Sequence, residues 1–330
     1  MSDYASLKMR SGEALSIARM GLGCMGMSEF YGPTSDDQSL ATLAKAVELG
    51  VNFFDTADMY GRGDNERLLG RFLTEHRASS VIATKCGIVR GATPADQRRN
   101  TSPSYIRDAC EASLARLGVE IIDLYYLHRI DEVTPVEDSM GELSRLAEEG
   151  KIRSAGLSEV DVETLRRAHA VMPVSAVQSE YSLSTRGGAV EGVIDECALI
   201  GALFVPFSPL GRGLLTGEYR DASLFDKKDF RTILPRFQPG ALQNNLTLVD
   251  ALAEIARDRG ATPAQIALAW VLARGAHVVP IPGTKSQTRL AENVAALRVS
   301  LTNANLAAIN AAIPEGSVSG ERYPVAKSSG

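Results

Sequence analysis

The chain contains few of the residues that build metal sites, disulfide frameworks or membrane segments. Its 330 residues include four cysteines, four histidines and one tryptophan. The cysteines are widely spaced and form no CxxC pair, so we expect neither a bound metal nor a disulfide scaffold. No apolar run approaches the roughly 20 residues of a membrane span. The first ten residues, MSDYASLKMR, lack the apolar core of a signal peptide.

Blocks of like charge are also missing. Lys and Arg number 35 against 40 Asp and Glu, which gives a formal net charge of −5, and both signs are scattered along the chain. This pattern disfavours a nucleic-acid partner, and nothing in the composition indicates a membrane partner. We expect a reduced, cytoplasmic protein that acts on a small molecule.

One unit recurs along the chain: a short apolar strand with a polar end, a loop, and a capped amphipathic helix that usually closes on glycine. Strands are expected at residues 17–23, 51–55, 81–85, 121–128, 151–158, 175–181, 202–208 and 277–282. Helices are expected from residues 35, 64, 102, 134, 161, 191, 248, 262 and 286, with a short one after residue 302. Eight such units favour an α/β fold, a closed (β/α)8 TIM barrel, as a single domain over residues 1–330. Residues 1–15 are a possible N-terminal hairpin, and residues 315–330 a loop-like tail.

Polar residues stand at the ends of these strands, where such barrels carry their chemistry. The strand ends present Asp55, Lys85, His128, Ser158, Gln178 and Ser208. Taken singly, each has an ordinary structural interpretation, such as an aspartate that caps a turn or a satisfied buried histidine. Their occurrence together on neighbouring strand ends indicates an active site, with Tyr60 in the loop after the second strand.

Asp55, Tyr60, Lys85 and His128 form a chemically coherent set. A free tyrosine has a pKa of ~10 and is a weak acid at neutral pH, and a neighbouring ammonium such as Lys85 lowers that pKa. Asp55 can hold Lys85 through a charge-assisted hydrogen bond, and His128 can orient a substrate oxygen. This set suits protonation of the oxyanion that forms when a carbonyl receives hydride.

The sequence GLGCMG at residues 21–26 matches the GxGxxG pattern of Rossmann nucleotide sites. A helix should begin within that motif, but residues 28–33 (SEFYGP) are not typical of a helix, and no strand with an acidic end follows at the right distance. The Rossmann interpretation is therefore disfavoured.

Several motifs in order along the chain resemble the aldo-keto reductase superfamily. They are VNFFDTADMYGRGDNERLLG, ATKCG, IIDLYYLHRID, GLSE, VQSEYS, PFSPLGRGLLTG and IPGTKSQTRLAEN, and they extend from about residue 21 to residue 293. The finer resemblance is to the bacterial, fungal and plant reductases with HRID and PGTK signatures. It implies a barrel that binds NADPH without a Rossmann motif and reduces an aldehyde or ketone, an oxidoreductase acting on CH–OH groups.

The resemblance also implies residue roles. Tyr60 is the general acid, Lys85 its partner, Asp55 the carboxylate that holds the lysine, and His128 the orienting residue. Cofactor contacts are implied for Gly23, Met25, Asp55, Ser158, Gln178, Phe207, Ser208, Leu210, Gly211, Arg212, Gly283, Thr284, Lys285, Gln287, Arg289, Glu292 and Asn293. Two residues depart from the family pattern: Phe207 stands where Tyr is common, and Glu159 where many members have Asn, so its carboxamide contact is doubtful.

Lys285 and Arg289 also carry a physical argument. Cations near a helix N-terminus oppose the helix dipole, and an anion bound there resolves the conflict. In the family this segment holds the adenosine 2′-phosphate, so we expect NADPH to be preferred over NADH.

Two other functions remain open on the sequence: a non-catalytic regulatory subunit of the same fold, and a lyase that uses Lys85 as a Schiff-base nucleophile. The substrate pocket should be shaped by the loops at residues 28–33, 90–100, 129–133 and 211–245. Aromatic residues of the last loop either wall this pocket or pack the loop onto the barrel: Tyr219, Phe225, Phe230 and Phe237. Arg98, Arg99 and Arg231 either serve an anionic substrate or are plain surface charges.

Overall fold

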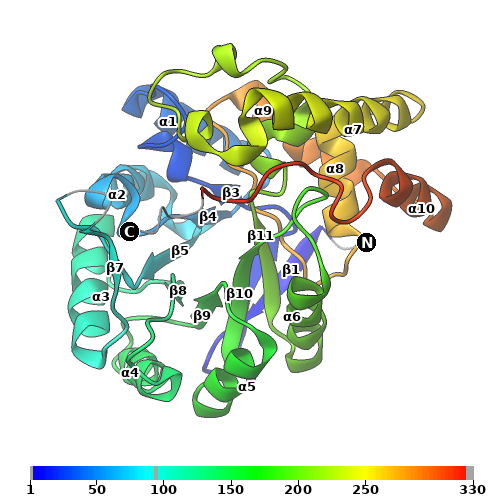
Figure 1. Ribbon diagram of the computed structural model, residues 1–330. Coiled ribbons are helices and arrows are strands. Elements are labelled where there is room, and N and C mark those ends of the chain that lie inside the picture. The colour runs from blue at the N-terminus through cyan, green and yellow to red at the C-terminus, as the bar shows by residue number, and fades with distance from the viewer. Residues whose placement is uncertain (1–2, 93–95, 325–330) are drawn as a thin grey trace, which may run out of the picture.

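A curled parallel sheet surrounded by helices forms the centre of the computed structural model, which describes residues 3–92 and 96–324 (Figure 1). The strands are hydrogen-bonded in the order β11-β10-β9-β8-β5-β4-β3. They are β3 (Leu22–Gly23), β4 (Phe53–Asp55), β5 (Val81–Cys86), β8 (Leu124–Leu127), β9 (Ala155–Ser158), β10 (Val174–Glu180) and β11 (Leu203–Phe207). Parts of two sequence-predicted segments, residues 93–95 of a mouth loop and residues 325–330 of the tail, lie outside the described residues, as do residues 1–2.

The eighth strand position, residues 277–282, is an irregular bridging segment and not the expected strand. Val279 N–H donates to the carbonyl of Phe204 (2.9 Å), and Gly21 N–H donates to the carbonyl of Pro280 (3.0 Å). The segment therefore contacts both edges of the sheet and closes the barrel. Its two prolines lack an N–H and cannot continue a hydrogen-bonded ladder, which explains the irregularity.

The expected first strand, residues 17–23, is split between two sheets. Residues 17–18 belong to an N-terminal hairpin of β1 (Tyr4–Lys8) and β2 (Ala14–Ala18), and only Leu22–Gly23 joins the barrel. The hairpin confirms the predicted N-terminal extension. Its buried Leu7 and Ile17 pack in one cluster with Phe53 and close one end of the barrel interior.

Alternating side chains of the strands fill two cores. Phe53 packs inside the barrel with the hairpin, whereas its neighbour Phe54 points outward and packs edge-on against Phe72 of a covering helix (ring centroids 5.1 Å apart). A strand covered on both sides is buried throughout, so it appears in the sequence as a continuous apolar run.

Helices cover the outside of the sheet (Figure 1). They are α1 (Asp36–Glu48), α2 (Asp64–His76), α3 (Pro103–Leu117), α4 (Val136–Glu148), α5 (Val162–Val171), α6 (Gly188–Ile200), α7 (Pro239–Arg257), α8 (Pro263–Leu272), α9 (Gln287–Ala295) and α10 (Asn303–Ala312). Predicted caps are confirmed at Ser35 and Thr262, which accept hydrogen bonds from backbone N–H groups in the first turn. Thr134 does not cap α4, whose N-cap position is Pro135.

The irregular stretch after β11 is shorter than expected. It contains the 3-10 turns η5 (Gly211–Thr216), η6 (Ala222–Leu224), η7 (Phe230–Ile233) and η8 (Pro235–Phe237), and α7 begins at Pro239 instead of residue 248. Leu242, Leu246 and Val249 lie on one face of α7 and pack with the buried Phe225 and Phe237. These two aromatic rings therefore pack the loop against α7.

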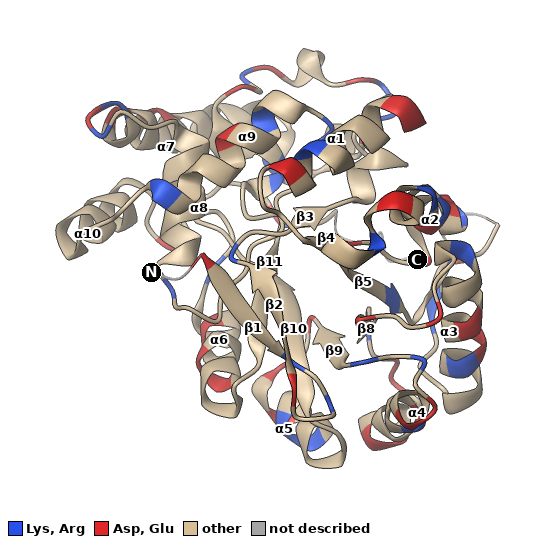
Figure 2. Cartoon of the chain, turned by 180° about the vertical axis from the view of Figure 1, so that it is seen from behind, with Lys and Arg blue, Asp and Glu red and all other residues tan. Residues whose placement is uncertain are grey.

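Charged residues of both signs are interspersed on the outer helices in the view of Figure 2. Across the described ranges no helix is both long and apolar enough to cross a membrane. No group of three or more His, Cys, Asp or Glu side chains within residues 3–92 and 96–324 is arranged to hold a metal ion. The four cysteines are buried and free.

Candidate active site

The four sequence-predicted catalytic residues converge at one end of the barrel. Asp55 is the last residue of β4, Lys85 lies near the end of β5, and His128 follows β8. Tyr60 begins a 3-10 turn, η2 (Tyr60–Gly63), in the loop after β4. Because β4, β5 and β8 are neighbours in a parallel sheet, their carboxyl ends bring these side chains together.

Lys85 and Asp55 form a fully buried ion pair. Lys85 Nζ lies 2.5 Å from Asp55 Oδ1 and also donates to the backbone carbonyl of Thr56 (2.7 Å). The Lys85 side chain is 0% exposed. Burial lowers the pKa of Lys85 and raises that of Asp55, and each charge opposes the effect on the other. The two side chains are therefore in direct contact, and their catalytic roles stay predictions.

Tyr60 and His128 lie directly beside this pair. Lys85 Nζ is 5.2 Å from the centroid of the Tyr60 ring, and the Tyr60 and His128 rings meet edge to face with centroids 5.9 Å apart. His128 Nδ1 is buried and has no hydrogen-bond partner within the described part of the chain. An unpaired buried nitrogen is costly, and this one lies where the sequence predicts a substrate oxygen.

The pKa of Tyr60 differs in direction from the sequence-based expectation. Burial raises the pKa of Tyr60 well above its usual value, the carboxylate of Asp55 raises it further, and Arg129 opposes the increase. The phenol is therefore protonated at neutral pH, the form that a proton donor requires.

His128 is held in its neutral form. Burial, Lys85 and Arg129 together lower the pKa of His128 well below its usual value. A neutral imidazole carries one N–H donor and one acceptor nitrogen. His128 can therefore orient a carbonyl oxygen without adding a charge to the site.

The residues expected around the nicotinamide have protein partners in this structure. Ser158 Oγ accepts a hydrogen bond from Arg129 Nη1 (3.0 Å), and Gln178 Nε2 donates to Asp55 Oδ2 (2.8 Å). Glu159 has a left-handed backbone (φ 56°) and is paired with Arg322. The contacts expected of Ser158 and Gln178 with a carboxamide remain predictions.

The turn after β11 has a backbone suited to an anion. Ser208, Gly211, Arg212 and Gly213 all have positive φ, between 49° and 95°, with Leu210 between them. Closely spaced residues of this kind form concave arrays of backbone N–H groups that bind anions. Two of these N–H groups are already engaged, because Gly211 donates to the carbonyl of Ser208 (2.9 Å) and Gly213 to that of Leu210 (3.0 Å). The contacts expected of residues 208–213 with the cofactor stay predictions.

Gly23 and Gly283 face each other across the closing seam of the barrel. A Cβ added to Gly23 would lie 2.9 Å from the carbonyl oxygen of Ile281, so the backbones approach closely. Met25 begins a three-residue 3-10 turn, η1 (Met25–Met27), instead of a long helix. This confirms that the GxGxxG pattern does not form a Rossmann site.

The segment expected to hold the 2′-phosphate is engaged by the protein itself. Lys285 Nζ donates to the carbonyls of Tyr31 and Pro33, both at 2.7 Å, and Arg289 forms an ion pair with Glu218. The argument from the helix dipole alone is thus weaker than expected, because both cations have partners. Two further residues of this segment accept hydrogen bonds: Thr284 from the N–H of Ser286, and Glu292 from the hydroxyl of Thr262. Gln287 is exposed, and Asn293 is buried.

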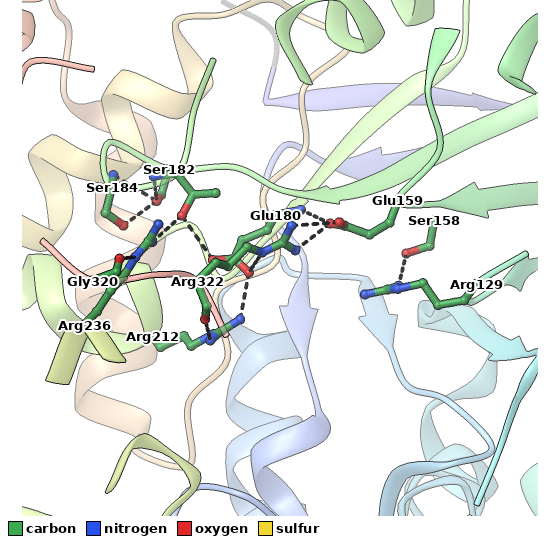
Figure 3. Close-up of polar contacts among 11 residues, drawn as sticks. Arg129, Ser158, Glu159, Glu180, Ser182, Ser184, Arg212, Arg236, Gly320 and Arg322 are labelled. Atoms are coloured by element: carbon green, nitrogen blue, oxygen red, sulfur yellow. Dashed lines mark hydrogen bonds and ion pairs between the residues drawn. The ribbon is translucent and has the colours of Figure 1, made fainter. Parts of the chain in front are cut away.

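Reasoning from the sequence missed two arginines at the site. Arg129 follows His128 directly and donates to Ser158, and Arg322 in the C-terminal tail pairs with Glu159 and Glu180 (Figure 3). Arg129 lies within the HRID motif, which could have directed attention to it. Arg322 stands in a Ser/Gly-rich stretch with no local signal.

The barrel mouth is largely filled by side chains. Tyr60 and His128 are each 8% exposed. A cleft of about 550 Å³ lies elsewhere on the surface and is lined by residues of α6, α8 and α10, including Glu191, Trp270 and Asn310. The chemistry of the strand ends, and not the size of a cleft, identifies the site.

Comparisons with known proteins agree with this geometry. The chain matches the model of the aldo/keto reductase family over residues 19–314. It is 43% identical over 314 residues to the NADP(+) aldo-keto reductase yakc of Schizosaccharomyces pombe, covering 94% of this chain and 92% of that protein. It is 42% identical over 313 residues to a probable aldo-keto reductase 1 of Glycine max, covering 94% and 90%.

A solved structure supports the same fold and family. The glycerol dehydrogenase AKR11B4 from Gluconobacter oxydans superposes with a TM-score of 0.84 at 29% identity, covering 98% of each chain. The barrel, the convergent polar strand ends and the family match over most of the length lead to one conclusion. The chain belongs to the aldo/keto reductase family of oxidoreductases.

Proposed function

We propose that the protein catalyses the NADPH-dependent reduction of an aldehyde or ketone to the alcohol. The observation that carries this proposal is the buried contact of Lys85 and Asp55 beside Tyr60 and His128. The family match and the name of the yeast relative, which includes NADP(+), support the choice of reaction and cofactor.

The residues divide the work of the reaction. NADPH, when bound along the strand ends, supplies the hydride. The neutral N–H of His128 donates to the carbonyl oxygen and aligns it. Tyr60 donates its phenolic proton to that oxygen as negative charge develops, and the ammonium of Lys85, held in place by Asp55, supports the phenolate that remains. Burial excludes water from the transfer.

The contacts of Lys85 disfavour a Schiff-base lyase. A nucleophilic lysine must be neutral and accessible to a carbonyl carbon. Lys85 is 0% exposed, and its ammonium is engaged by Asp55 and by the carbonyl of Thr56. These contacts suit a charged supporting group.

A screen of NADPH oxidation over aldehydes, ketones and sugars tests the proposal, with Tyr60→Phe as the matched variant. We expect turnover with at least one carbonyl class and a loss of about 10²-fold or more in kcat for Tyr60→Phe, the typical size of a general-acid contribution. NADPH binding without turnover of any carbonyl would instead favour the regulatory-subunit alternative. Equal turnover by wild type and Tyr60→Phe would exclude Tyr60 as the acid.

A further inference from the structure

The C-terminal segment, residues 317–323, crosses the mouth of the barrel and is fixed there. Ser319 and Asn245 exchange two hydrogen bonds, of 2.7 and 3.0 Å. Gly320 lies so close to the turn before α7 that a Cβ would be 2.7 Å from the carbonyl carbon of Pro235, and its φ is 88°. In Figure 1 this segment, in red, runs from α10 above β11 toward β4. It is therefore a seated element and not a free tail.

Arg322 ties this segment to the ends of two strands. Its Nη1 and Nη2 both donate to the carboxylate of Glu159 at 2.8 Å, and its Nε donates to Glu180 Oε2 at 2.6 Å (Figure 3). Glu180 ends β10 and Glu159 directly follows β9. The guanidinium is planar, and it donates from both Nη atoms to one carboxylate and from Nε to another. These three hydrogen bonds fix its orientation.

Glu180 is held from a second side. Arg212 Nη2 donates to the same oxygen, Glu180 Oε2, at 2.8 Å, and Arg212 Nη1 donates to the backbone carbonyl of Arg322 at 3.0 Å. The ring of Tyr323 lies against both guanidinium groups, 4.5 Å from that of Arg212 and 5.1 Å from that of Arg322. Glu180 is 3% exposed, so these cations are needed to compensate a buried carboxylate.

The segment reaches the predicted reaction centre. The guanidinium carbon of Arg322 is 5.7 Å from the centroid of Phe207, the ring expected to stack on the nicotinamide. Arg322 thus lies at one boundary of the site, beside the Phe207 ring.

We propose that Arg322 is a positioning residue of the carbonyl-reducing site: anchored by Glu159 and Glu180, it fixes the C-terminal segment beside Phe207 as one wall of that site. This inference rests on the proposed function. It gives Glu159 a role in seating the segment instead of binding the carboxamide, where many family members have Asn. The class of ligand that the wall shapes is the carbonyl substrate.

The first experiment compares Arg322→Met, Arg322→Lys and the control Arg167→Met. Arg167 forms an equivalent two-pronged pair with Glu137 on outer helices (2.7 and 2.8 Å), away from the site. Loss of the charged contacts of Arg322 should raise KM for a carbonyl substrate by about tenfold or more. The dissociation constant of NADPH, measured by fluorescence titration, should change by a smaller factor in Arg322→Met than the KM of the carbonyl substrate.

Two further results sharpen the comparison. The KM of Arg322→Lys should lie between those of the wild type and Arg322→Met. An ammonium restores the positive charge but cannot donate two parallel hydrogen bonds to one carboxylate. Arg167→Met should match the wild type. Equal KM values for Arg322→Met and Arg167→Met would overturn the proposal, as would a faster Arg322→Met enzyme, which would show that the segment obstructs the site. An unchanged KM with an apparent kcat that falls only in proportion to the loss of folded protein, followed by thermal melting, would also overturn it.

A second experiment does not depend on turnover. Trypsin cleavage after Arg322, followed by mass spectrometry on the native protein, reports how firmly the segment is seated. Glu159→Gln weakens the anchor and should accelerate this cleavage several-fold, whereas the control Glu137→Gln should not. Equal rates in the two variants would overturn the anchoring. A wild type that turns over no carbonyl but shows the expected cleavage would contradict the proposed function alone.

Discussion

Gln178 crosses the barrel to hold Asp55: its side-chain N–H donates to Asp55 Oδ2 at 2.8 Å, while Lys85 engages Oδ1 at 2.5 Å. The two oxygens of one buried carboxylate are thus fixed by groups from β10 and β5. This relationship gives Gln178 a structural task within the catalytic pair, in addition to its expected contact with the cofactor.

Replacing Gln178 by Met should therefore destabilise the protein even without cofactor. The change keeps the length of the side chain but leaves Asp55 Oδ2 without its donor, so we expect the free energy of unfolding to fall by about 1–3 kcal/mol. Urea unfolding of the cofactor-free protein measures this. Gln243→Met, at an exposed position of α7, is the control. An unchanged unfolding free energy for Gln178→Met would contradict the assigned role.

The pH dependence of carbonyl reduction should reflect the raised pKa of Tyr60. The donor must be protonated, and a group with a raised pKa keeps its proton up to that pKa. We expect kcat for reduction to stay level from about pH 6 to about pH 9 and to fall only at higher pH. Alcohol oxidation, which needs the phenolate, should increase with pH. A fall in reduction with a midpoint near neutrality would show that Lys85 acidifies Tyr60 in the loaded enzyme.

Lys285 provides a test of cofactor choice. Lys285→Met removes a cation from the predicted 2′-phosphate site and should raise the NADPH dissociation constant by about tenfold or more. The NADH constant should change little. Lys45→Met, at an exposed pair on α1, is the control. Because Lys285 also donates to the carbonyls of Tyr31 and Pro33, a purely structural role would weaken both cofactors equally.

Two helical glycines should respond in opposite directions to alanine. A Cβ on Gly70 in α2 would lie 2.7 Å from the carbonyl oxygen of Arg116, where backbone must move, so Gly70→Ala should destabilise the fold by about 1–3 kcal/mol. Gly141 in α4 has no atom within 4 Å of that position, and Gly141→Ala should stabilise the fold by about 0.5–1 kcal/mol. Chemical unfolding of both variants checks this. Stabilisation in both would refute the close α2–α3 approach.

Much of the fold and the tetrad could be predicted because their signals are local. Apolar runs that end in Asp55, Lys85 and His128 mark strand ends, and parallel strands bring such ends together. The closing segment at residues 277–282 was less predictable, because it has the apolar character of a strand but its prolines prevent regular pairing.

The seating of the tail had no local signal. Arg322 and Glu159 are 163 positions apart in the chain, and neither stands in a pattern that points to the other. The direction of the pKa shift of Tyr60 was also out of reach, because it depends mainly on burial and then on the nearby carboxylate of Asp55. Both properties arise from packing between distant segments.

The barrel is joined by irregular backbone where residues 277–283 meet Gly21 and Gly23. Because Gly23 and Gly283 form an isolated bridge and not part of a continuous ladder, this junction should be the first part of the barrel to exchange its amide hydrogens with solvent. Gly23 and Gly283 flank it, and both are expected cofactor contacts. A dinucleotide that contacts both glycines would stabilise this junction. Cofactor binding would then raise the melting temperature of the protein as well as enable turnover.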